Sequence, residues 1–154
     1  MCGVYDEGGD LVFEHSSNEH TSDALISILS QVSKTHDIHR IIYANGPGSY
    51  MGLKVSYVTL KSYCVVKNCD FYAVSGFELN GGGSVRATKT MSFIKEYINK
   101  DSSKEHLSQI FSDGDGEYIV RLASIEASEF KLPLNLNTLQ TSADTVPMYF
   151  TQAV

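Results

Sequence analysis

The stretch Asn45-Gly46-Pro47-Gly48-Ser49-Tyr50-Met51-Gly52-Leu53-Lys54 decides the fold that we expect of this chain. It follows an apolar run at 38–44, which predicts a buried strand, and it precedes a segment with helical spacing of apolar residues up to about residue 66. Two glycines around a proline allow a sharp turn, and Ser49 is a suitable helix N-cap. The stretch therefore predicts a strand, a tight loop and a helix.

Elements of the same kind lie on both sides of this loop. Apolar residues recur at helical spacing over 24–32, behind the capping run Thr21-Ser22-Asp23, and we expect His36 and Asp37 to close that helix. Short apolar runs at 3–5 and 11–14 predict a β-hairpin, and 71–74 predicts a strand. Residues 1–79 thus predict the order ββ-α-β-α-β, an α/β fold in which helices pack on a mixed sheet.

The second half of the sequence gives weaker signals. Residues 80–84 (NGGGS) predict a loop, 112–117 a turn and 118–122 a strand. The segment 91–98 fits a strand and a helix equally well. We therefore expect residues 80–154 to form a small, partly β second unit, and the pattern does not define the fold of 80–145.

Composition and charge exclude several classes of protein. The chain has 154 residues and a formal net charge of −6, with scattered lysines and arginines, which argues against direct binding of nucleic acid. No stretch approaches the roughly 18 apolar residues of a membrane span, and the acidic N-terminus does not resemble a signal peptide. The three cysteines include no CxxC pair, as is usual for free thiols in a reducing compartment. We expect a cytoplasmic protein.

The sequence offers no catalytic or metal constellation. It lacks a GxSxG motif, a CxxC pair and an HxxxH pair, so we expect no enzyme, no bound metal and no protease. The glycine loop also fails two nucleotide motifs, because Leu53 follows Gly52 where a Walker A loop needs lysine, and the spacing is GxGxxxG rather than GxGxxG. Two interpretations of the loop stay open: an anion site at a helix N-terminus, or a plain strand-to-helix connection.

As a string, residues 45–54 resemble the G-P-G-S-[FY]-T-G-[LV]-R signature of the TsaB family. Three further segments resemble that family: Glu19-His20-Thr21 before the first helix, Ala73-Val74-Ser75 at a strand end, and Pro147-x-Tyr149 near the C-terminus. The match covers roughly residues 11–79 and is thin elsewhere. Met51 and Lys54 depart from the family, which usually has Thr and Arg at these positions.

The resemblance implies an actin-like ATPase (RNase H-like) domain with a reduced second domain. Residues 1–79 would be the N-terminal subdomain and 80–154 the C-terminal remnant. The similarity begins at the family's second strand, so the first strand, which carries an Asp-Thr/Ser phosphate loop, is not in this sequence. We therefore expect no intact ATP site and no cofactor, and any ATP would be bound by partner subunits.

The resemblance also implies a function and partners. The family supplies a non-catalytic subunit of the tRNA-modification machinery, which makes threonylcarbamoyladenosine. This subunit binds TsaD, the enzyme that transfers the threonylcarbamoyl group to the adenosine beside the anticodon. A TsaE-like ATPase is the implied third partner, and tRNA would be contacted only indirectly. Two alternatives stay open: a nucleotide-binding enzyme of the actin-like class that uses the loop at 46–49, and a self-associating homodimer.

The helix after the loop is the expected partner surface. At roughly 100° per residue it has two apolar faces, of which a helix lying on a sheet needs only one. Small residues at 52, 56 and 59 form a third strip that suits a close helix–helix contact. The second apolar face is covered either by the chain's own first helix or by a partner. The candidate loop residues are Gly46, Pro47, Gly48 and Ser49, and the candidate contact residues are Tyr50, Met51, Leu53, Lys54, Tyr57, Val58, Leu60 and Lys61, with Asp23, Leu25 and Ile28 of the first helix.

Overall fold

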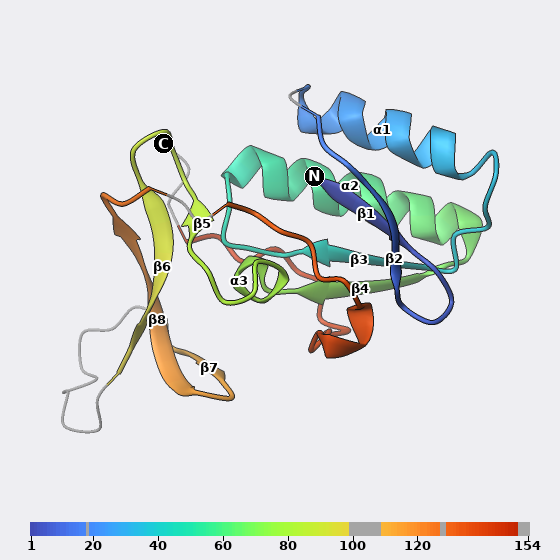
Figure 1. Ribbon diagram of the computed structural model, residues 1–154. Helices are drawn as coiled ribbons and strands as arrows, with labels where there is room; N and C mark the ends of the chain where they lie inside the picture. Colours follow the sequence, from blue (N-terminus) through green and yellow to red (C-terminus); the bar gives the residue numbers. More distant parts are fainter. Residues whose placement is uncertain (18, 99–108, 127–128, 151–154) are drawn as a thin grey trace.

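The structure is a computed structural model that describes residues 1–17, 19–98, 109–126 and 129–150. It is a mixed α/β chain, as the sequence predicts (Figure 1). The helices are α1 (Thr21–Val32), α2 (Tyr50–Lys67), α3 (Gly76–Leu79) and the 3₁₀ turn η2 (Leu136–Thr138). The strands are β1 (Cys2–Tyr5), β2 (Leu11–His15), β3 (Arg40–Ala44), β4 (Asp70–Val74), β5 (Val85–Arg86), β6 (Ser92–Tyr97), β7 (Phe111–Asp113) and β8 (Gly116–Ala123).

The first half follows the predicted order of elements. β1 and β2 form an antiparallel hairpin, and β3 and β4 pair in parallel in the register Arg40↔Asp70 to Ala44↔Val74, with α2 as the crossover between them. Both long helices lie on the same side of β3 and β4 (Figure 1). The single mixed sheet that we expected is not present in the described residues. Instead their strands form three sheets, β1-β2, β3-β4 and β5-β6-β8-β7, because β1 and β3 do not pair.

The ends of α1 differ from the prediction. His20 is the N-cap, and its side chain makes no capping hydrogen bond, so the run that we expected to cap the helix begins it instead. Asp23 lies in the first turn, where a negative charge is favoured by the helix dipole. The helix ends at Val32, before His36 and Asp37, because the backbone then turns: the N–H groups of Thr35 and His36 both donate to the carbonyl of Val32.

The core lies between the two long helices and the β3-β4 pair. Its buried cluster consists of Leu25, Tyr43, Leu60 and Ala73. Tyr43 stacks on Phe71 with 5.0 Å between ring centroids. The β1-β2 hairpin is tied to this core through Cys2, whose side chain packs against the cluster.

The ambiguous segment at 91–98 is a strand. β6 pairs antiparallel with β8 from Ser92↔Ala123 to Tyr97↔Tyr118, and β7 and β8 form the hairpin around the predicted turn. Long-range pairing with β8 therefore makes this segment a strand, whereas the local sequence pattern left strand and helix equally open. Figure 1 shows this four-stranded sheet standing beside the helical part.

The C-terminal tail crosses back to the first half of the chain. The N–H of Leu11 donates to the carbonyl of Leu134 over 2.9 Å, and Ala73 and Ser142 exchange two backbone hydrogen bonds of 2.9 and 2.8 Å. The N–H of Met148 donates to the carbonyl of Asn45 over 2.7 Å. Residues beyond 130 thus help to build the part that we expected to end at residue 79.

Candidate functional site

The glycine loop has the predicted conformation. Ser49 caps α2, since its hydroxyl oxygen accepts the N–H of Gly52 over 3.0 Å. Gly46 has φ +143°, a backbone conformation that other residues rarely adopt, and the Gly46–Pro47 peptide bond is cis. A Cβ on Gly46 would lie 2.6 Å from the carbonyl oxygen of Met148. The first glycine is therefore required because the tail passes directly over it.

Packing inside the chain uses much of this loop. Asn45, Gly46 and Pro47 are buried, and the carbonyl of Gly46 accepts the N–H of Gly76 over 2.7 Å. The Oδ1 atom of Asn45 is buried and has no hydrogen-bond partner among the described residues. Of the loop residues, only Ser49 is exposed, with Gly48 half-buried. These contacts favour the plain strand-to-helix connection over an anion site.

The four segments that resemble the TsaB family meet at this loop. The ring of Tyr149 packs against that of Tyr50 in a tilted arrangement, with 4.6 Å between centroids. Val74 accepts the N–H of Asn45 over 3.1 Å. A Cβ on Gly52 would lie 4.0 Å from the hydroxyl of Thr21. Segments far apart in the sequence thus form one junction around the start of α2.

The strip of small residues on α2 lies on the side of the helix that faces the chain's own first helix, and its members are half-buried. Gly52 faces Thr21, and the hydroxyls of Ser33 and Tyr63 hydrogen-bond over 2.6 Å. Between the helices lies an open groove of about 400 Å³, lined by Ile26, Leu29, Ser30, Ser33, Lys34, Thr59, Tyr63 and Lys67. The close helix–helix contact that the small residues predict is therefore an internal one.

Several predicted contact residues are inside the protein. Leu25, Ile28, Leu53 and Leu60 are each at most 8% exposed, because they form the side of the helices that packs on the strands. Tyr57 is half-buried, with its ring 6.1 Å from that of Tyr43. These side chains support the helix pair from within. Direct contact of these residues with a partner stays a prediction, and the four aliphatic side chains offer little exposed surface for it.

The second apolar face of α2 is uncovered. We call it the α2 stripe: Met51, Val58, Val65 and Val66, exposed by 62%, 53%, 76% and 81%. The first three recur at seven-residue spacing, which puts them on one line along a helix. Lys54 and Lys61 are exposed beside it, and the ammonium of Lys61 donates to the hydroxyl of Tyr57 over 2.7 Å.

Two more of the predicted contact residues, and one that was not predicted, lie on the surface of the two long helices. Asp23 is exposed on α1, as a contact residue must be, and Tyr50 is half-buried against Tyr149. Ile26 of α1, which the sequence did not single out, is 61% exposed beside the groove. In the sequence, Ile26 lies outside the helical repeat of apolar residues that forms the buried side of α1. This position could have identified it as an exposed apolar residue.

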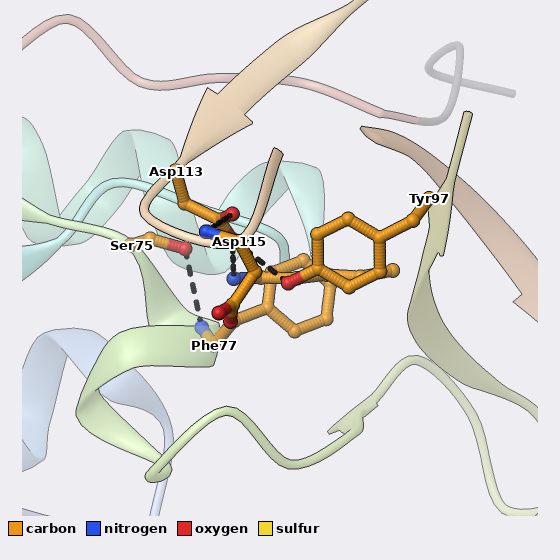
Figure 2. A network of polar contacts seen from close by, with 6 residues as sticks. Ser75, Phe77, Tyr97, Asp113 and Asp115 are labelled. Carbon is orange, nitrogen blue, oxygen red and sulfur yellow. Dashed lines mark hydrogen bonds and ion pairs between the residues drawn. The ribbon is translucent and has the colours of Figure 1, made fainter. Parts of the chain in front are cut away.

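A polar network joins the four-stranded sheet to α3 (Figure 2). The ammonium of Lys95 lies 2.5 Å from Oδ2 of Asp113, which also accepts the hydroxyl of Tyr97 over 3.1 Å. The Lys95 ammonium lies 4.7 Å from the centroid of the Tyr118 ring and 5.6 Å from that of Phe77. Although burial opposes it, hydrogen bonds from Lys95, from the N–H of Asp115 and from Tyr97 lower the pKa of Asp113. The network holds a structural ion pair between β6 and β7, the two strands on either side of β8.

The described residues contain no group of three or more His, Cys, Asp or Glu side chains placed to hold a metal ion. Within the same residues, no helix has the length and apolarity needed to cross a membrane. Comparison with protein-family models, with curated protein sequences and with solved structures finds no match to this chain.

Proposed function

We propose that this chain is a TsaB-like scaffold subunit that binds a TsaD-like transferase through the α2 stripe. The observation that carries the proposal is the exposure of four apolar side chains along one helix, and Ile26 of α1 is exposed as well. Contiguous exposed apolar side chains of this kind mark protein interfaces. The junction of the four family-like segments at the start of the same helix supports the same assignment.

In this proposal the chain performs no chemistry of its own. Burial of the α2 stripe stabilises a competent conformation of the transferase, which moves the threonylcarbamoyl group to the adenosine beside the anticodon. The net charge of −6 suits a subunit that leaves tRNA contact to its partners. A TsaE-like ATPase and any bound ATP belong to the same complex, which works in the cytoplasm.

Met51 gives the proposal a specific feature. It stands where the resembled family usually has Thr, and here its side chain is 62% exposed in the α2 stripe. A longer apolar side chain adds buried area to a contact at this point. We therefore propose that Met51 contributes to the choice of partner.

The test is co-purification with the TsaD-like subunit of the same organism, using Val58→Glu as the disrupting variant. Val58 is 53% exposed, so a charge there spares the core but opposes burial in an interface. The matched control is Val12→Glu on β2, where the valine is 60% exposed on a different element. Tyr57 is unsuitable as a probe because its ring packs on Tyr43 and Phe71.

We expect the native chain and Val12→Glu to retain the transferase, and Val58→Glu to lose it by at least tenfold in affinity. If the native chain binds no transferase, with ATP present and at low and moderate salt, the proposal is wrong. Light scattering of the isolated chain then distinguishes the homodimer, which Val58→Glu should dissociate into monomers. A thermal shift with ATP tests the nucleotide-binding alternative.

A further inference from the structure

The end of α2 brings two cysteine thiols into contact. Sγ of Cys64, in the last turn of the helix, lies 2.8 Å from Sγ of Cys69. A disulfide bond measures about 2.05 Å, and nonbonded carbon atoms, which are smaller than sulfur, pack best at about 3.5–4.0 Å. The two sulfurs are thus closer than ordinary packing requires, without being bonded.

The local backbone explains this contact. Asn68, which follows the helix, adopts the left-handed conformation with φ 54° and ψ 46°. The chain then folds back, so that the N–H of Cys69 donates to the carbonyl of Cys64 over 3.1 Å. A left-handed residue at this place is a common way to end a helix. Here it sets the second thiol against the first, five residues earlier.

The two thiols differ in accessibility. Cys64 is 4% exposed, whereas Cys69 is half-buried at the surface end of the pair. Burial, with further contributions from Cys69 and Asp70, raises the pKa of Cys64 to about 12. An oxidant in solution therefore meets Cys69 first, and Cys64 stands behind it as the resolving thiol.

We propose that Cys64 and Cys69 form a reversible thiol–disulfide modification site that locks the end of α2 to the start of β4. The oxidant is a small-molecule disulfide of the glutathione type. The sulfur of Cys69 attacks one sulfur of this disulfide and releases one small thiol, which leaves a mixed disulfide on Cys69. The sulfur of Cys64 then gives up its proton and attacks the sulfur of Cys69, which releases the second small thiol. Two protein thiols are oxidised and one small disulfide is reduced to two thiols.

The proposed disulfide constrains the C-terminal end of α2. The proposed bond encloses Val65 and Val66 of the α2 stripe and Lys67 of the groove, which lie between the two cysteines in the sequence. A cross-link between residues five apart restricts the unfolded chain and holds this turn in its folded shape. The site stands apart from the proposed partner binding, because it concerns thiols that lie outside the stripe.

The test is incubation of the folded, full-length chain with oxidised glutathione, followed by alkylation and digestion with trypsin under non-reducing conditions. Trypsin cuts after Lys61, Lys67 and Arg86, so the proposed bond joins peptide 62–67 to peptide 68–86. We expect this linked pair, a loss of two hydrogens in the intact mass, and Cys2 still free for alkylation. The Cys2→Ser variant should behave in the same way, and Cys69→Ser should form no internal bond.

A second measurement separates a site built by the fold from chance oxidation. In a glutathione redox buffer, the ratio of linked to reduced chain should be on the order of tenfold higher for the folded protein than in concentrated guanidinium chloride. The thermal midpoint of the linked form should rise by a few degrees. Alkylation of all three thiols after oxidation, a stable glutathione adduct on Cys69, a bond between two chains, or an equal or lower ratio in the folded state would each overturn the proposal.

Discussion

The hydroxyl of Tyr43, near the C-terminal end of β3, donates a hydrogen bond to the main-chain carbonyl of Thr145, 102 residues further along the chain. Both residues are buried, at 4% and 7% exposure. Burial, together with the nearby Tyr57, Tyr149 and Asp144, raises the pKa of Tyr43 far above its ordinary value. The tail is thus part of the core of the first half and not an appendage to it.

Replacing Tyr43 by phenylalanine should therefore loosen the tail. The Tyr43→Phe variant leaves a buried carbonyl oxygen without its donor, which costs about 1–2 kcal/mol of the free energy of unfolding. Urea denaturation measures this loss. Tyr72→Phe is the control, since Tyr72 is half-buried on the neighbouring strand, and we expect a change below about 0.5 kcal/mol there. Equal effects of the two variants would contradict the assigned hydrogen bond.

The glycine loop gives a matched pair of substitutions. Gly46→Ala introduces a Cβ 2.6 Å from the carbonyl oxygen of Met148 at φ +143°, so both sterics and backbone conformation oppose it. We expect a loss of about 3 kcal/mol, with increased proteolysis of the tail. At Gly48 the atoms nearest to an added Cβ belong to the Leu53 side chain, at 3.5 Å, which is an ordinary contact. Gly48→Ala should therefore stay within about 1 kcal/mol of the native chain, and a reversed order would show that the tail does not pass over Gly46.

Local signals predicted the elements of the first half well. Ser49 caps α2 as expected, because capping depends on a side chain and a backbone only three residues apart. Segment 91–98 was undecided, since β6 is fixed by pairing with β8, which lies more than twenty residues further along the chain. The helical pattern identified two apolar faces on α2, but it could not show that Leu53 and Leu60 face the strands while Val58 and Val65 face outward. The contact of Cys64 with Cys69 depends on the left-handed Asn68, which the spacing of the cysteines does not indicate.

The ion pair in the four-stranded sheet gives a further prediction. Asp113→Asn removes the only charge within salt-bridge distance of Lys95 among the described residues, and the two side chains are only 23% and 17% exposed. We expect a loss of about 1–2 kcal/mol, less than for a fully buried pair because water still reaches both groups. Asp115→Asn is the control, because this exposed residue donates to Asp113 through its backbone N–H, which the substitution keeps. Thermal denaturation should show little change for it, and a change as large as that of Asp113→Asn would argue against the ion pair.

The reduced protein should lose stability on the alkaline side, and Cys64 should account for part of the loss. Burial raises the pKa of this thiol from 9.0 to about 12, so above pH 9 the unfolded chain releases a proton that the folded chain keeps. The unfolded state then binds fewer protons, and the free energy of unfolding falls as pH rises between 9 and 12, by at most about 1.4 kcal/mol per pH unit for this group. Below pH 9 the contribution is fully present.

Urea denaturation at pH 8, 9 and 10 in a phosphine reductant measures the slope. We expect a shallower slope for Cys64→Ala than for the native chain, whatever the absolute stability of the variant. Tyr43, whose pKa burial also raises, contributes later, because tyrosines in the unfolded chain release their protons only near pH 10. Identical slopes would mean that the Cys64 thiol ionises as readily in the folded chain as in the unfolded one.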